Sequence, residues 1–194
     1  MKYRCILADC PWKFRNAGTR LNPSYAGKQR KKAVYKPMPL EDIIGMGSFV
    51  KDLAEDDSFL LLWCPNALVI DGTADVVAKA WGFKAKQLIP WLKTSKAGKP
   101  RIAGGNYSRV CTEQLVLCRR GAAQVKRRDV PGIIIAARPR LHSGKPDASY
   151  EYIERLIEGP YIELFARRQY SKDWMVMGDQ LEGKYQVTLG MKAA

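Results

Sequence analysis

The sequence predicts an α/β fold with a mostly parallel sheet and helices on both of its faces. Two observations support this prediction. Short segments that are almost continuously apolar recur along the chain, as in strands that are buried on both faces. Segments with apolar residues at helical spacing alternate with them, which indicates strands joined by crossover helices. The expected strands are residues 3–8, 58–63, 87–93, 113–118, 132–137, 161–166 and 174–177.

Three helices are expected where apolar residues recur at helical spacing. Two glycines, Gly45 and Gly47, weaken the pattern of the first helix. The third helix opens at Pro146-Asp147 and ends at Gly159-Pro160, in agreement with the preference for proline at helix starts and glycine at helix ends. The expected helices are residues 40–53, 66–81 and 147–158.

The chain has 194 residues, with 33 Lys and Arg against 19 Asp and Glu, and a formal net charge of +14. This length suits a single domain. A basic excess of this size favours a polyanionic partner, and nucleic acid over a membrane surface. No apolar stretch approaches the roughly 18 residues that span a bilayer, and the first residues lack the apolar region of a secretory signal. We therefore expect a cytoplasmic protein.

The positive charge is concentrated in two segments without apolar periodicity, residues 13–36 and 94–109. We expect both to be loops at the carboxyl ends of the strands, with side chains that contact phosphates. Phosphate contacts give affinity without sequence readout, so we expect low to modest sequence specificity. The cations predicted to bind the substrate strand are Lys28, Arg30, Lys31, Lys32, Lys93, Lys96 and Arg101.

The cysteine pattern argues against a metal centre. The chain has five cysteines, without a CxxC pair, and a single histidine, His142. Zinc sites need clustered cysteine and histidine ligands. We therefore expect reduced, buried thiols and no bound metal.

The sharpest chemical signal is Asp9-Cys10-Pro11-Trp12, at the carboxyl end of the first expected strand, where ligands bind in open α/β sheets. A carboxylate and a backbone carbonyl at this turn can accept both hydrogens of an exocyclic base amine and leave its lone pair freer. Proline fixes the turn, and the indole ring can stack on a base turned out of its helix. An ordinary turn beside a core tryptophan would have the same sequence, so the tetrapeptide alone leaves the function open.

The tetrapeptide resembles the Asp-Pro-Pro-Trp hallmark of the MT-A70 family of S-adenosylmethionine-dependent N6-adenine methyltransferases. Further blocks occur in the family's order, and the resemblance extends from about residue 3 to residue 182. The blocks are Val34-Tyr35-Lys36-Pro37-Met38, Leu60-Leu61-Leu62-Trp63, Trp91-Leu92-Lys93-Thr94, Thr112-Glu113-Gln114-Leu115, Lys145-Pro146-Asp147, Glu163-Leu164-Phe165-Ala166-Arg167-Arg168 and Gly178-Asp179-Gln180-Leu181. The resemblance implies a Rossmann-like class I methyltransferase fold with circularly permuted motifs, in the small stand-alone form of bacteria and phages.

The resemblance also implies roles for individual residues. Asp9, Pro11 and Trp12 would be catalytic, with Trp12 and Tyr35 at the substrate base. Lys145 would pair with the methionine carboxylate of S-adenosylmethionine. Further residues are expected to border the cofactor, and His142 is a candidate for orienting the substrate. The residues expected around the cofactor are Asp9, Cys10, Lys145, Glu163, Phe165, Arg167, Asp179 and Gln180.

The expected substrate is adenine in DNA, with RNA as the alternative, and the chain would act as a monomer or a homodimer. Two other functions stay open. The same fold could act on N4 of cytosine, although related enzymes of that type often carry serine in place of Asp9. It could also be a non-catalytic scaffold that binds nucleic acid, although intact Asp9, Trp12 and Lys145 count against this. Cys10 replaces the family's first proline, which affects the geometry of the turn.

Overall fold

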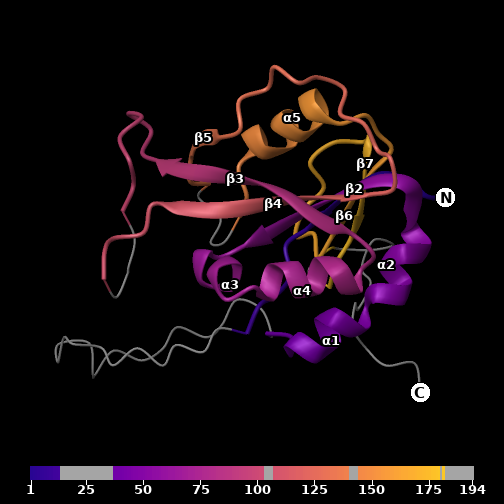
Figure 1. Ribbon diagram of the computed structural model, residues 1–194. Helices are drawn as coiled ribbons and strands as arrows, with labels where there is room; N and C mark the ends of the chain where they lie inside the picture. Colours follow the sequence, from indigo (N-terminus) through magenta and orange to yellow (C-terminus); the bar gives the residue numbers. More distant parts are fainter. Residues whose placement is uncertain (14–36, 103–106, 140–143, 180, 182–194) are drawn as a thin grey trace.

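The structure is a computed structural model that describes residues 1–13, 37–102, 107–139, 144–179 and 181. Its strands form one seven-stranded sheet in the order β5-β3-β4-β2-β1-β6-β7 (Figure 1). The strands are β1 (Tyr3–Ala8), β2 (Ala54–Cys64), β3 (Lys84–Thr94), β4 (Thr112–Arg120), β5 (Ile134–Ala137), β6 (Tyr161–Leu164) and β7 (Trp174–Met177). The helices are α1 (Leu40–Gly45), α2 (Gly47–Leu53), α3 (Asn66–Ile70), α4 (Thr73–Ala80) and α5 (Asp147–Leu156). None of these helices has the length and apolar character to cross a bilayer.

The sheet is mixed, because β4 runs antiparallel to both of its neighbours, β2 and β3. All the other neighbouring strands pair in parallel. The predicted α/β class is confirmed, and every expected strand is present. The reversed direction of β4 agrees with its connection: residues 95–102 and 107–111, the described part of the segment between β3 and β4, contain no crossover helix, and a parallel strand would need one.

Helices cover both faces of the sheet, as predicted. Figure 1 shows α1, α2, α3 and α4 on one side and α5 on the other. The two layers explain why the strands are continuously apolar: in β1, Ile6 packs into the core on the side of α1 and α4, and Leu7 packs into the core on the side of α5. Full burial of each such side chain contributes roughly 1.5–3 kcal/mol.

Two of the three expected helices are each interrupted once. The expected helix 40–53 breaks between α1 and α2, and the expected helix 66–81 breaks between α3 and α4. Gly72 has a φ of 82° at the second break, a conformation that glycine adopts without steric cost. At the first break, a Cβ on Gly47 would lie 2.5 Å from the carbonyl oxygen of Ala80, so no larger residue fits there. The break therefore lets α2 approach the end of α4.

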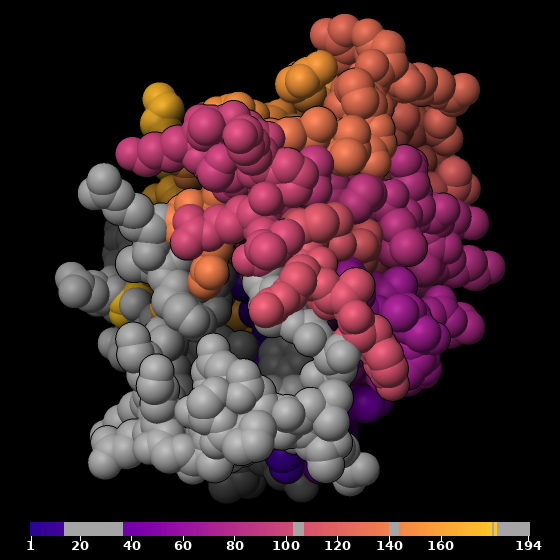
Figure 2. Space-filling model, turned by 90° about the vertical axis from the view of Figure 1, so that its left-hand side faces the viewer, coloured from indigo at the N-terminus to yellow at the C-terminus, as the bar shows by residue number. Residues whose placement is uncertain are grey.

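The carboxyl ends of the parallel strands meet on one side of the molecule. In Figure 1 this is the side toward which β3 points, and Figure 2 shows the same side face-on. The surface there is hollowed near its middle, with indigo atoms of the N-terminal segment at depth below the pink atoms of the chain that follows β3 (Figure 2). Because ligands of α/β proteins bind at this edge, the candidate site is expected here.

Candidate active site

The turn after β1 is held in place by backbone and indole hydrogen bonds. The amide of Trp12 donates to the carbonyl of Cys10 at 2.8 Å, and the amide of Met38 donates to the carbonyl of Pro11 at 2.8 Å. The indole Nε1 of Trp12 donates to the carbonyl of Trp63, at 2.9 Å. Pairing of the turn with Met38 and with the end of β2 leaves Asp9 at a defined position beside β6, where its amide donates to Leu164.

The Trp12 ring is buried, and its predicted stacking on a base stays a prediction. Its residue exposure is 4%, and the ring packs in the core with Ile43 and Met46. A base needs an exposed ring face for stacking. In this structure the indole contacts the core and supports the turn after β1, as in the alternative of a core tryptophan.

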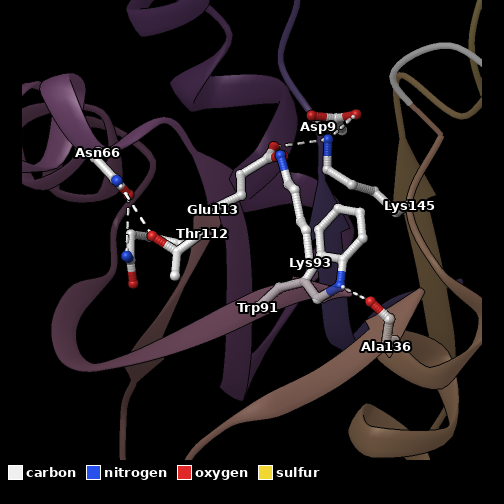
Figure 3. Close-up of polar contacts among 9 residues, drawn as sticks. Asp9, Asn66, Trp91, Lys93, Thr112, Glu113, Ala136 and Lys145 are labelled. Carbon is white, nitrogen blue, oxygen red and sulfur yellow. Dashed lines mark hydrogen bonds and ion pairs between the residues drawn. The ribbon is translucent and has the colours of Figure 1, made fainter. Parts of the chain in front are cut away.

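Four side chains of alternating charge lie at the centre of the site (Figure 3). The Lys145 ammonium lies 2.8 Å from Oδ2 of Asp9 and 3.0 Å from Oε1 of Glu113. The Lys93 ammonium lies 2.8 Å from Oε2 of Glu113. Asp9 follows β1, Lys93 is in β3, Glu113 is in β4, and Lys145 immediately precedes α5. Four segments far apart in the sequence thus contribute one charge each.

Burial makes these charges depend on one another. Only 7% of the Lys145 side chain is exposed, yet Asp9 and Glu113 raise the pKa of Lys145 above its ordinary value, so it stays protonated. Burial raises the pKa of Asp9, and Lys145 only partly opposes this shift. Burial would raise the pKa of Glu113 as well, but Lys145 and Lys93 together bring it below its ordinary value.

A pocket opens beside Asp9 and Lys145, and Glu163 is buried in its wall. The hydroxyl of Tyr150 donates to Oε2 of Glu163 at 3.0 Å. The Tyr150 ring stacks on Tyr170, with centroids 4.4 Å apart, and the guanidinium of Arg168 lies 5.4 Å from its centroid. The residues that line the pocket are Asp9, Gly144, Lys145, Tyr150, Glu163, Phe165, Arg167 and Arg168.

Phe165 has an unusual backbone conformation where the chain leaves β6. Its φ is 62°, in the left-handed region that costs a non-glycine residue about 1 kcal/mol or more. Such strain is often found at ligand sites. Here it turns the chain sharply beside Asp9 and directs the following residues, Arg167 and Arg168, to the pocket.

Glu163 provides a test of the electrostatics of the pocket. Burial raises the pKa of Glu163 to about 7, although the Tyr150 hydrogen bond opposes the shift. A carboxyl group whose pKa is raised in the folded state contributes fully to stability when the pH is below its pKa in the unfolded chain. That contribution is lost as the pH rises through the folded-state pKa of about 7. Replacing it with glutamine (Glu163→Gln) should therefore remove about 3 kcal/mol of pH dependence between pH 4.5 and pH 8. Urea unfolding of both proteins across this range measures the difference.

The control for this measurement is Glu158→Gln, which removes an exposed carboxylate that pairs with Lys126. This variant should follow the pH profile of the unsubstituted protein. If the unfolding free energies of all three proteins depended on pH in the same way, ionisation of Glu163 would not destabilise the fold, contrary to the prediction.

The structure brings together some, but not all, of the residues predicted for the site. Asp9, Lys145, Glu163, Phe165 and Arg167 meet around one pocket. Cys10 is buried behind the turn, and Asp179 follows β7. Lys96 and Arg101 are exposed beyond the end of β3. The predicted residues Lys28, Arg30, Lys31, Lys32, Tyr35, His142 and Gln180 lie outside the described residues.

Sequence analysis did not assign three residues that shape the site: Glu113, Tyr150 and Arg168. Glu113 belongs to the block Thr112-Glu113-Gln114-Leu115, and Tyr150 lies in the expected helix 147–158. A charged residue at the start of a strand whose centre is apolar was the available signal for Glu113. For Tyr150, its hydroxyl was the signal, because a buried tyrosine needs a partner for this group.

An α/β fold with a pocket and convergent charged groups at its strand ends is of the class that binds small ligands at that edge. The MT-A70 family model matches residues 3–180. The chain therefore belongs to the MT-A70 family, whose members have the methyltransferase fold.

Three relatives illustrate the similarity. The chain is 32% identical over 117 residues to a "Putative N(6)-adenosine-methyltransferase MT-A70-like" of Medicago truncatula, which covers 58% of this chain and 19% of the relative. It is 27% identical over 143 residues to an "N(6)-adenosine-methyltransferase MT-A70-like" of Arabidopsis thaliana; the match covers 72% of this chain and 20% of the relative. It is 25% identical over 182 residues to the "N6-methyladenosine RNA methyltransferase MTA1" of Cryphonectria parasitica, which covers 91% and 51%. The chain thus spans about a fifth of the plant relatives and about half of the fungal one.

Proposed function

We propose that this chain transfers a methyl group from S-adenosylmethionine to N6 of adenine in RNA. The observation that carries the proposal is the Asp9–Lys145 pair at the wall of a pocket that also contains Glu163, in a chain of the MT-A70 family. The sequence alone favoured DNA. The relatives favour RNA, because the fungal one is named an RNA methyltransferase and the plant ones are named for adenosine, the ribonucleoside.

The residues of the pocket fit S-adenosylmethionine chemically. Its methionine end carries an ammonium and a carboxylate, which suit the neighbouring Asp9 carboxylate and Lys145 ammonium. Its ribose carries two hydroxyl donors, which suit the buried Glu163 carboxylate. When bound, it supplies a methyl group on a positively charged sulfur. We further propose that the fold is the class I Rossmann-like type with circularly permuted motifs, since the Asp9 turn precedes the Glu163 strand.

The chain's own residues would activate and position the adenine amine. Lys145 binds Oδ2 of Asp9, so we assign Oδ1 as the acceptor of one amine hydrogen. The Cys10 and Pro11 carbonyls each accept one backbone amide, and a carbonyl oxygen has a second lone pair for the other amine hydrogen. Because burial raises the pKa of Asp9, its carboxylate is also suited to take the proton that the amine releases.

The described turn after β3 fits a role in holding the RNA backbone. The amide of Ser95 donates to the Lys99 carbonyl at 2.8 Å, and the amide of Arg101 donates to the Lys93 carbonyl at 2.7 Å. These bonds close a short turn that presents Lys96, Lys99 and Arg101 to solvent beside the site. Exposed cations at this place are suited to phosphates, whose contacts would make binding strongly dependent on salt.

The experiment that tests the function is incubation of the chain alone with methyl-labelled S-adenosylmethionine and either unmodified RNA or unmodified DNA. Mass spectrometry of the digested nucleosides then identifies the product, with Asp9→Ala as the control. Labelled N6-methyladenosine from RNA, absent with the variant, is the expected result. Label in DNA alone would replace the proposed substrate, and label at N4 of cytosine would replace the proposed reaction. Cofactor binding without any transfer would indicate that the isolated chain needs a partner.

A further inference from the structure

The Lys93 side chain is engaged inside the site rather than presented to a phosphate. Its ammonium lies 2.8 Å from Oε2 of Glu113 and 4.9 Å from the ring centroid of Trp91. Only 23% of the Lys93 side chain and 18% of the Glu113 side chain are exposed. The Trp91 ring is itself fixed, because its Nε1 donates to the Ala136 carbonyl at 3.0 Å (Figure 3). The predicted phosphate contact would require this ammonium to leave a largely buried pair.

Glu113 is the shared member of two ion pairs. Each of its carboxylate oxygens pairs with a different ammonium group: Oε1 with Lys145 and Oε2 with Lys93. Lys145 in turn is divided between Glu113 and Asp9. The position of Lys145 between two carboxylates therefore depends on the charge of Glu113, and that charge depends on Lys93.

We propose that Lys93 is a positioning residue that acts through Glu113 to hold the Lys145 ammonium between Glu113 and Asp9. This inference rests on the proposed function, because the benefit is to the Asp9 carboxylate. If Glu113 became neutral, Lys145 would pair with Asp9 alone. It would then compete with the adenine amine for the lone pairs of the Asp9 carboxylate. If Glu113 stayed ionised without Lys93, it would draw Lys145 away from Asp9. Lys93 prevents both outcomes, because its positive charge offsets one of the two negative charges that Lys145 faces.

The kinetic test compares Lys93→Met with Lys93→Arg, which keeps the charge, and with Lys84→Met, which removes an exposed lysine at the opposite end of β3. Lys93→Met should lower kcat about tenfold at pH 7, with KM for RNA and its salt dependence unchanged. Lys93→Arg should recover most of the rate, and Lys84→Met should leave the rate unchanged. An unchanged kcat with a raised KM and a weaker salt dependence would instead make Lys93 a phosphate contact and overturn the inference.

A second readout does not depend on activity. The carboxyl 13C resonance of Glu113 reports its titration, and Lys93→Met should raise its midpoint by about one pH unit, whereas Lys84→Met should not. An unmoved midpoint would overturn the inference even if the methylation assay succeeds. A chain that fails to methylate but shows the shift would disprove the proposed function and leave the Lys93–Glu113–Lys145 coupling established. If Lys93→Met does not fold, Lys93→Gln gives the same measurement.

Discussion

Replacement of Asp9 by alanine is expected to reduce the rate of methyl transfer about a thousandfold, with the chain still folded. The alanine removes the carboxylate that we assign to the adenine amine and that pairs with Lys145 at 2.8 Å. Replacement by asparagine should cost less, about ten- to a hundredfold, because the amide oxygen still accepts a hydrogen bond but carries no charge. Single-turnover rates of the two variants, with saturating RNA and cofactor, measure the effect.

The matched control for Asp9 is Asp129→Asn, which removes an exposed carboxylate that pairs with Arg127. It should retain the full rate. If Asp9→Ala keeps more than a tenth of the rate, the amine must be activated by another group, and the assignment of Asp9 is wrong. Circular dichroism of each variant separates a loss of chemistry from a loss of structure.

Replacement of Lys145 by methionine is expected to affect both stability and cofactor binding. It leaves the Asp9 and Glu113 carboxylates without the cation that they share, which should lower the free energy of unfolding by about 3 kcal/mol at pH 7.5. The same change should weaken S-adenosylmethionine binding by tens of fold, since the methionine carboxylate loses a charged donor. Urea unfolding and calorimetric titration measure the two effects.

The stability effect of Lys145→Met should depend on pH with a definite sign. Without the lysine, burial acts on the pKa of Asp9 without its main opposing cation and on the pKa of Glu113 with Lys93 as the remaining opposing cation. Both pKa values should therefore rise, and the ionised forms of the two carboxyl groups should stabilise the fold less. The deficit should therefore be largest above these raised values and shrink as the pH falls and the groups take up protons. Lys145→Arg keeps the charge and should show little deficit. A deficit that stays constant from pH 7.5 to pH 5 would mean that lost packing, and not unpaired charge, is responsible.

The sequence predicted the strands well because strands buried on both faces are almost continuously apolar, and this pattern does not depend on the neighbours. The direction of β4 was not predictable in the same way, since the apolar pattern is the same in either direction. The helix break near Gly47 was indicated only as a weak point, and the break at Gly72 was not predicted. At the first break α2 approaches Ala80 closely, a contact between residues that are distant in sequence.

The site was predictable where a motif carries it, and less so where tertiary contacts decide. Asp9 and Lys145 were assigned from motifs, and the structure places them in contact. Lys93 was grouped with surface cations because its charge is visible in the sequence but its partner is not. Trp12 was assigned to the substrate from the tetrapeptide. Its burial could not be predicted, because it depends on Met38 and Trp63, which are distant in sequence. Charge type is thus readable from the sequence, whereas the partner of each charge is not.

The antiparallel direction of β4 has a consequence for how such a protein can diversify. Lys93 lies at the end of β3 and Glu113 at the start of β4, so their ion pair joins the two ends of the segment between them. The amide of Lys93 also donates to the Cys111 carbonyl at 2.8 Å, which closes the same base through the backbone. A segment closed in this way can change in length and composition during evolution without moving the catalytic charges. If the proposed function holds, we expect related proteins to differ in substrate range through this loop and to keep the same chemistry.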